Sequence, residues 1–91
     1  MYNIILTKSV NKSIERLETS NPQIAKRITV FLKEVLSKIE NPKNLKNATK
    51  LKGYDNKYRW RIGDYRIIGI IKDDILTIEI IKISTRQGAY K

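Results

Sequence analysis

Three arginines crowd one short segment of the chain: Arg59, Arg61 and Arg66. Between them, Gly63-Asp64 is typical of a two-residue hairpin turn, because glycine adopts the positive φ that the first turn position needs. This turn would place Arg61 opposite Arg66, and the alternation of side chains along a strand would put all three arginines on one face. Like charges opposed across two strands destabilise a sheet. The cluster therefore indicates a site for something polyanionic.

An ordinary solvated strand face is the alternative interpretation of the same cluster. Glu79 is expected on that face, where it would pair with one arginine. One carboxylate cannot neutralise three guanidinium groups, so we favour the binding site. Arginine suits phosphate because its planar fork donates two parallel hydrogen bonds and stays charged at any working pH. Lys50 and Lys52 flank the hairpin and would extend a phosphate track, although they are equally well explained as solvated loop residues.

The composition limits the kinds of binding partner and the kinds of catalytic or metal site that the chain can have. The chain carries 19 lysine and arginine residues against 9 aspartate and glutamate residues, a net charge of +10. So basic a small domain usually meets phosphates or an acidic partner, because the excess charge speeds its association with anions. The chain has no histidine and no cysteine, which excludes disulfides, thiolate metal sites and every serine–histidine or cysteine–histidine catalytic pair.

The remaining features are those of a small cytoplasmic domain. At 91 residues the chain is expected to form a single domain, residues 1–91, with one modest core. The first residues lack the pattern of a signal peptide, and no apolar run approaches the ~20 residues of a membrane span. The aspartates fall in turn-like positions, and most of the glutamates are scattered over the helices. We therefore expect no metal site and no cofactor.

The elements that position the arginines follow from the hydrophobic pattern. The apolar, β-branched run from Tyr2 to Leu6 predicts a strand, and Thr7 or Ser9 would then cap a first helix. Asn21-Pro22 predicts the start of a second helix, with asparagine at the cap and proline in the first helical position. Apolar residues recur from there at three- and four-residue steps, as in an amphipathic helix, until Asn41-Pro42 ends it.

Three strands are expected after the helices. Residues 43–50 are polar and rich in lysine, so we predict a loop there. The arginine hairpin follows, and Lys72-Asp73-Asp74 predicts a second turn before a long apolar strand, residues 75–83. Strands grouped after helices predict an α+β fold with the order β-α-α-β-β-β, in which the two N-terminal helices pack on one face of a small antiparallel sheet.

Strand alternation assigns each side chain to a face of that sheet. The face toward the helices is predicted to carry Trp60, Ile62, Ile67, Ile71, Leu76, Ile78 and Ile80. The opposite face is predicted to carry the three arginines together with Ile68, Ile70, Ile81 and Ile83. A monomer seldom leaves such an apolar patch bare, so we expect a partner chain to cover it.

Three segments of the chain form one longer pattern: Lys50-Leu51-Lys52-Gly53, then Tyr58-Arg59-Trp60-Arg61-Ile62-Gly63-Asp64-Tyr65-Arg66-Ile67-Ile68, then Ile83-Ser84-Thr85-Arg86 with Tyr90. Over nearly the whole chain this pattern resembles the RelE/ParE superfamily, the toxins of type II toxin–antitoxin pairs. For the RelE-like branch the resemblance implies a metal-independent, ribosome-dependent endoribonuclease, which inhibits translation by cutting mRNA in the ribosomal A site. In that reaction a ribose 2′-hydroxyl attacks the adjacent phosphate and leaves a 2′,3′-cyclic phosphate.

The resemblance also implies roles by position. It would make Arg59 and Arg66 clamps on the phosphate and its developing charge, with Arg61 in the second basic place on the strand before the turn. Arg86 would protonate or stabilise the leaving oxygen. Tyr90 would stack on a base or assist proton transfer. The implied partners are an acidic antitoxin, mRNA and the ribosome.

Two other classes of function stay open beside this one. A ParE-like protein would inhibit DNA gyrase without nuclease activity, and an inactive relative would at most bind nucleic acid. Arg61 stands where some relatives use lysine, and arginine is a poor general base because it stays protonated at any working pH. This arginine and the missing histidine slightly favour the ParE-like alternative. Thr85 and Gly69 also depart from the pattern, since relatives often have histidine or lysine at the first position and an aromatic residue at the second.

Overall fold

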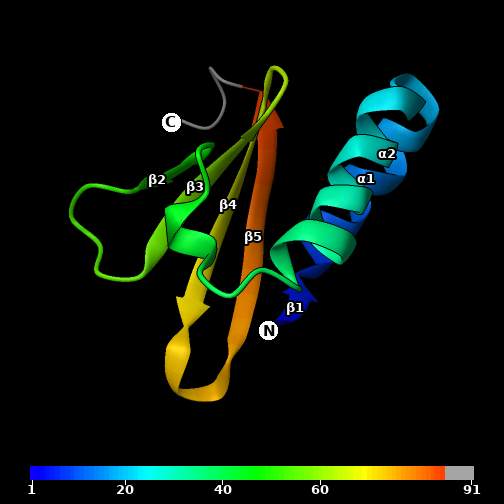
Figure 1. The fold of residues 1–91 in the computed structure, drawn as a ribbon. Helices are drawn as coiled ribbons and strands as arrows, with labels where there is room; N and C mark the ends of the chain where they lie inside the picture. Colours follow the sequence, from blue (N-terminus) through cyan, green and yellow to red (C-terminus); the bar gives the residue numbers. More distant parts are fainter. Residues whose placement is uncertain (86–91) are drawn as a thin grey trace.

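The structure, a computed structural model, describes residues 1–85 and has two layers, a sheet and a pair of helices that cover one of its faces (Figure 1). The helices and strands in chain order are β1 (Asn3–Leu6), α1 (Lys8–Ser20), α2 (Pro22–Val30), β2 (Ala48–Lys50), β3 (Lys57–Ile62), β4 (Tyr65–Lys72) and β5 (Thr77–Thr85). The strands lie in the order β1-β5-β4-β3-β2. The predicted α+β fold, with both helices on one face of the sheet, is confirmed.

Both helices begin where the capping residues predict. Oγ1 of Thr7 accepts a hydrogen bond from the N–H of Val10 at 3.2 Å, and Oδ1 of Asn21 accepts one from the N–H of Ile24 at 3.4 Å. Each cap satisfies a backbone donor that the first helical turn leaves without a partner. Pro22 follows Asn21 in the first helical turn, as expected.

The second helix continues beyond α2 but ends earlier than predicted. Residues Phe31–Leu36 form a π-helical segment, and Asn41-Pro42 instead begins a short 3₁₀ turn, Pro42–Asn44. Oδ1 of Asn41 accepts a hydrogen bond from the N–H of Lys43 at 3.3 Å, so this asparagine caps a new turn. An Asn-Pro pair thus starts a helical turn at both places in this chain, and the second pair is wrongly predicted as a stop.

The sheet differs from the predicted one in two respects. β1 pairs with β5 in parallel, from Asn3 opposite Thr77 to Leu6 opposite Ile80, so the sheet is not wholly antiparallel. The antiparallel prediction came from hairpin turns, and no hairpin connects these two strands. In addition, Ala48–Lys50 forms β2, antiparallel to β3, in a stretch predicted as a loop. This strand is short and polar, so it leaves no hydrophobic pattern in the sequence.

The arginine hairpin has the predicted register. Arg61 lies opposite Arg66 and Trp60 opposite Ile67, and Gly63 in the turn has a φ of +57°. Residues with a side chain rarely adopt this backbone conformation, which explains the glycine at this position. The register decides which face of the sheet each arginine occupies.

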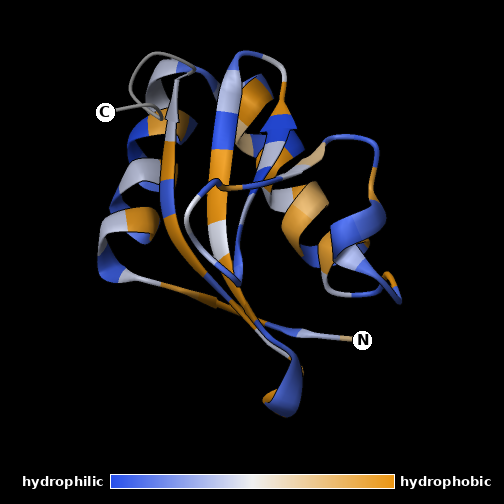
Figure 2. Ribbon diagram, turned by 90° about the vertical axis from the view of Figure 1, so that its left-hand side faces the viewer, coloured by the Kyte–Doolittle hydropathy of each residue, from blue (hydrophilic) through white to orange (hydrophobic). Residues whose placement is uncertain are grey.

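The core lies between the sheet and the helices, and Figure 2 shows hydrophobic segments on both the strands and the helices. Its fully buried members include Val10, Ile28, Leu36, Trp60, Ile67, Ile78 and Ile80. Two of the predicted positions are wrong. Leu76, predicted in the core, is 53% exposed in the turn before β5. Ile83, predicted beside the arginines, is a core residue with 7% exposure.

A β-bulge explains the position of Ile83. Ile68 pairs with Lys82, whereas the next residue, Gly69, pairs with Ile80, so β5 carries one extra residue between the two pairs. The extra residue reverses the alternation of side chains for the rest of the strand. Ile83 therefore points toward the helices, although a regular strand would place it on the opposite face.

Trp60 lies at the centre of the core and explains why position 69 is glycine. Its indole is fully buried, and Nε1 donates a hydrogen bond to the carbonyl of Pro42 at 3.1 Å. A Cβ on Gly69 would lie 2.9 Å from Cζ3 of Trp60 and 3.1 Å from Cδ1 of Ile80. The indole thus fills the space that the aromatic residue expected at position 69 would need.

Gly69→Ala is expected to destabilise the protein by about 1–3 kcal/mol, because the added methyl group overpacks a core that has no space for it. Urea unfolding followed by circular dichroism measures the change in the free energy of unfolding. In a Trp60→Phe background the same substitution should cost clearly less, because the smaller ring removes the nearest atom. An equal cost in both backgrounds would contradict a clash with the indole.

Three segments that are far apart in the sequence meet at Asp73, in the turn between β4 and β5. Oη of Tyr2 donates a hydrogen bond to the Asp73 carboxylate at 2.6 Å, and Nζ of Lys43 donates another at 2.7 Å. The bonds from Lys43 and then Tyr2 lower the pKa of Asp73, and the bond to Asp73 raises the pKa of Lys43.

Acid is expected to abolish the contribution of this contact. A carboxyl group whose pKa is lowered by folding contributes stability above its unfolded pKa of about 3.9, and the contribution is lost as the pH falls through the folded value. Because Asp73 is exposed, Asp73→Asn should cost less than about 1 kcal/mol at pH 7 and less still near pH 2. Thermal melting of both proteins at the two pH values makes the comparison. A difference that persists in acid would argue against the carboxylate as its source.

Candidate nucleic-acid interface

The three arginines lie on the face of the sheet opposite the helices. Arg59 and Arg61 come from β3 and Arg66 from β4; Arg61 is directly opposite Arg66, while Arg59 is opposite Ile68. Their exposure differs, because Arg61 is exposed, Arg59 is half-buried and Arg66 is only 4% exposed. The structure therefore brings the arginines together as predicted, but in three different environments.

Arg66 is a buried cation. Its Nη1 donates a hydrogen bond to the carbonyl of Tyr65 at 3.4 Å, whereas a guanidinium group carries five N–H donors. No ion pair within residues 1–85 includes Arg66; the pairs there are Lys38–Glu34, Lys43–Asp73 and Lys72–Glu79. A buried charge without a counter-ion destabilises a fold, so this position favours a bound anion.

Ser84, on β5, lies in line with Arg61 and Arg66. It lies opposite Arg66, and its buried Oγ has no hydrogen-bond partner in the part of the chain that the structure describes. Arg61, Arg66 and Ser84 thus form a line of donors across β3, β4 and β5, which we name the anion row. Ser84 belongs to the sequence pattern Ile83-Ser84-Thr85-Arg86 but was assigned no role, because a serine at the end of an apolar strand is ordinary.

Asn47 holds the backbone of Arg61 in place. The N–H of Arg61 donates a hydrogen bond to the Asn47 carbonyl at 3.0 Å, and Nδ2 of Asn47 donates one back to the Arg61 carbonyl at 2.9 Å. Nε of Arg61 also donates a hydrogen bond to the carbonyl of Gly63 at 3.4 Å. Arg61 is therefore an exposed cation whose backbone N–H and carbonyl are both held by Asn47.

The carboxylate expected beside the arginines lies elsewhere. Glu79 is opposite Ile70 on β4, and its carboxylate is 3.7 Å from Nζ of Lys72. Within residues 1–85 no ion pair joins it to Arg61 or Arg66. Glu79 therefore does not neutralise Arg61 or Arg66 in the described part of the chain.

The other predicted site residues do not join the anion row. Lys50 lies opposite Tyr58, which packs against the core, so Lys50 belongs to the face of the sheet away from the arginines. Lys52 is exposed in the loop between β2 and β3. Arg86 and Tyr90 lie outside the described residues.

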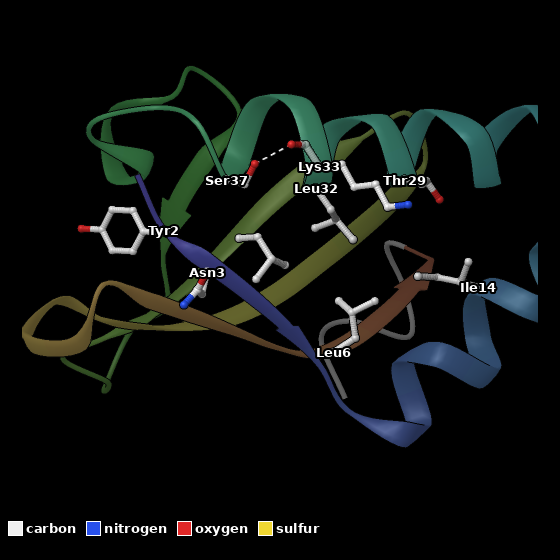
Figure 3. Close-up of a pocket in the computed structure, with 9 residues that line it drawn as sticks. Tyr2, Asn3, Leu6, Ile14, Thr29, Leu32, Lys33 and Ser37 are labelled. Atoms are coloured by element: carbon white, nitrogen blue, oxygen red, sulfur yellow. Dashed lines mark hydrogen bonds between the residues drawn. The ribbon is translucent and has the colours of Figure 1, made fainter.

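A cavity of about 310 Å³ lies on the helix side of the sheet, between β1 and the two helices (Figure 3). Its lining is largely apolar, with a hydrogen bond from Oγ of Ser37 to the carbonyl of Lys33 at its margin. The lining residues are Tyr2, Asn3, Ile4, Leu6, Ile14, Thr29, Leu32, Lys33 and Ser37. None of them belongs to the anion row, so the cavity is separate from the candidate site.

The donors available at the site are cationic or neutral. Within residues 1–85, acidic side chains form no group of three or more that could hold a metal ion. No helix in the same part of the chain is long and apolar enough to cross a membrane. Guanidinium and hydroxyl groups suit an oxyanion such as phosphate.

Comparisons with known proteins agree with the fold. A family model described as the ParE toxin of the type II toxin–antitoxin system parDE matches residues 4–90. RelE1 of Methanocaldococcus jannaschii is 37% identical over 90 residues, which cover 99% of this chain and 96% of that protein. In the RelB–RelE antitoxin–toxin complex from Methanococcus jannaschii, a chain with 30% identity superposes with a TM-score of 0.74, covering 94% of each chain. In the toxin–antitoxin complex RelBE2 from Mycobacterium tuberculosis, a 21% identical chain gives a TM-score of 0.73 over 93% of this chain and 98% of its own length, a likeness of fold alone.

Proposed function

The chain belongs to the RelE/ParE superfamily, the toxins of type II toxin–antitoxin systems, and we propose that it is a ribosome-dependent mRNA endoribonuclease that inhibits translation. The anion row carries this proposal, because a buried Arg66 that has no ion pair with any other residue of 1–85, opposite an exposed Arg61, favours a bound phosphate. The similarity to RelE1 supports the RelE-like branch of the superfamily.

The proposed reaction is a transfer within the RNA backbone. The 2′-hydroxyl oxygen of one ribose bonds to the adjacent phosphorus, and the 5′-oxygen of the next nucleotide leaves. The products are a 2′,3′-cyclic phosphate and a free 5′-hydroxyl. Negative charge builds on the phosphate oxygens, where Arg61 and Arg66 would donate hydrogen bonds, with Arg59 farther along the same face. Such electrostatic stabilisation is usually the largest single contribution to catalysis.

Proton transfer in this reaction needs groups outside the anion row. Arginine stays protonated at any working pH, so Arg61 cannot remove the proton from the 2′-hydroxyl. We propose that Tyr90 assists this transfer or stacks on a base, and that Arg86 protonates or stabilises the leaving oxygen. Both residues lie outside the described part of the chain.

We also propose that an acidic antitoxin covers the face of the sheet that carries Arg59, Arg61 and Arg66, which we call the arginine face. The net charge of +10 favours an acidic partner. Ile5, which is 51% exposed, and the half-buried Ile70 lie on the same face as the arginines, both aligned with Glu79. An acidic amphipathic segment would bury these side chains and neutralise the arginines. In support, two similar folds were solved as toxin–antitoxin complexes.

Induced expression with parallel measurements of mRNA and plasmid topology tests the proposed activity. Primer extension on translated mRNA should show cuts within codons, while plasmid supercoiling stays unchanged. Intact mRNA together with trapped gyrase cleavage complexes would overturn the proposal.

Inhibition of DNA gyrase is the second candidate function. The match to the ParE family model over residues 4–90 favours it, as does the absence of histidine from the chain. In this case the arginines would bind a partner without cutting RNA. A supercoiling assay with purified gyrase separates the two candidates.

A further inference from the structure

β3 carries a line of cations that continues beyond the anion row. Lys57, Arg59 and Arg61 alternate along the strand and therefore share one face, with Ile70, Ile68 and Arg66 as their respective partners on β4. Lys57 and Arg61 are about 13 Å apart, given a strand rise of about 3.3 Å per residue. The arginine face thus extends to the start of β3, where the loop from β2 arrives.

This loop, residues 51–56, is a closed, hydrogen-bonded structure. The N–H of Tyr54 donates a hydrogen bond to the carbonyl of Leu51 at 3.3 Å, and Gly53 between them has a φ of +87°. These features are those of a type II turn, which needs glycine at its third position. The N–H of Leu51 also donates a hydrogen bond to the carbonyl of Lys57 at 2.9 Å, which closes the loop at its base.

The loop presents an aromatic ring next to the cations. Tyr54 is 50% exposed, and Nζ of Lys57 lies 4.0 Å from the centroid of its ring. This cation–π contact orients the ring without burying it. Lys52, one residue before the turn glycine, is exposed as well, and Asp55 is the one acidic residue between Lys50 and Lys57.

An exposed aromatic ring beside a cationic track is the arrangement by which proteins bind unpaired nucleic acid. The cations neutralise phosphates, and the ring stacks on a base, which is accessible only where the base is not already in a duplex. An acidic peptide would be attracted by the cations alone and would not require the ring. The combination therefore favours an RNA strand over an acidic protein.

We propose that Tyr54 stacks on an unpaired base of RNA whose backbone runs along Lys57, Arg59 and Arg61 toward the anion row. Lys52 would neutralise a phosphate on the far side of the stacked base. The loop is then a second RNA contact, separate from the residues that act on the scissile phosphate. This inference rests on the proposed action on RNA, but binding through the loop is measured without cleavage.

Fluorescence anisotropy with a labelled single-stranded RNA tests the proposal. Methylation of every 2′-hydroxyl of the probe prevents the proposed reaction, so that the measurement reports binding alone. Tyr54→Ala should weaken binding by about 5- to 150-fold, the loss expected for one base–aromatic stack. Tyr54→Trp and Tyr54→Phe should retain the affinity. Lys57→Ala should also weaken binding and lower the slope of log affinity against log salt by about 0.7, the value for one phosphate on a single strand.

Lys12→Ala, an exposed lysine on α1, is the matched control and should leave RNA binding unchanged. Unchanged affinity of a folded Tyr54→Ala protein, with mRNA cleavage intact, would overturn this inference and leave the proposed function standing. If Tyr54→Ala lost antitoxin binding but kept RNA binding, this result would also overturn the inference and would assign the loop to a protein partner. Tyr54-dependent RNA binding by a protein that leaves translated mRNA intact would support the loop contact while contradicting the proposed cleavage.

Discussion

Arg66→Ala should lower the rate of mRNA cleavage by about 100- to 1,000-fold, because the scissile phosphate would lose a charged donor aimed at its developing charge. Arg66 is 4% exposed and lies between Arg61 and Ser84 in register, at the centre of the anion row. Primer extension over a time course in a translation extract measures the rate. Arg16→Ala, on the exposed surface of α1, is the matched control and should cut at the wild-type rate.

Replacing Arg66 should lower the cleavage rate without lowering the stability of the fold. Arg66→Met keeps most of the side-chain volume and removes a buried charge that has a single hydrogen bond of 3.4 Å and no ion pair within residues 1–85. Replacing such a group by an apolar one is neutral or stabilising, so the melting temperature should stay equal or rise. A clear fall in melting temperature, with wild-type cleavage by the folded fraction, would make Arg66 a structural residue and remove the main support for the anion row.

Trp60→Ala should destabilise the protein by about 3–5 kcal/mol, the usual cost of truncating a large aromatic residue in a core. Small domains have total stabilities of about 5–15 kcal/mol, so this one substitution would leave much of the protein unfolded at moderate temperature. The reason is local: the indole is fully buried, and its centroid lies 6.3 Å from that of the Tyr58 ring, which stacks beside it. Urea unfolding of the wild type and the variant measures the difference.

A second substitution separates packing from hydrogen bonding at Trp60. Trp60→Phe keeps a ring in the core but loses the hydrogen bond from Nε1 to the carbonyl of Pro42, which contributes about 1 kcal/mol. It should therefore cost less than Trp60→Ala. Unchanged unfolding of Trp60→Ala would mean that Trp60 faces solvent and that the faces of the sheet are exchanged.

Local signals predicted the hairpin well. The register of Arg61 against Arg66 depends on two turn residues, Gly63 and Asp64, whose conformational preferences operate within a few positions. The helix starts at Thr7 and Asn21 have the same local character, since each depends on one capping hydrogen bond. Features of this kind depend on a few neighbouring residues, so they can be predicted from the sequence.

The features that were missed depend on contacts between distant segments. The bulge that turns Ile83 into the core arises from the pairing of β4 with β5, and an alternating pattern cannot show where an extra residue falls. The burial of Arg66 and the pairing of β2 with β3 likewise exist only once the sheet has formed. Tyr54 carries no signal in the sequence because a tyrosine is ordinary in a lysine-rich stretch, and the proposal for it depends on the turn and on the position of Lys57.

The parallel pairing of β1 with β5 joins the first strand to be synthesised with the last. Strand β5 lies between β1 and β4, so the first strand made has no partner until nearly all the described residues have been translated. Ile78 and Ile80, both fully buried, arrive with β5, as does Ser84 of the anion row. Contacts between such distant segments form slowly. A chain that ends before β5 therefore lacks two fully buried core residues and one member of the anion row, so neither the core nor the anion row is complete without this strand.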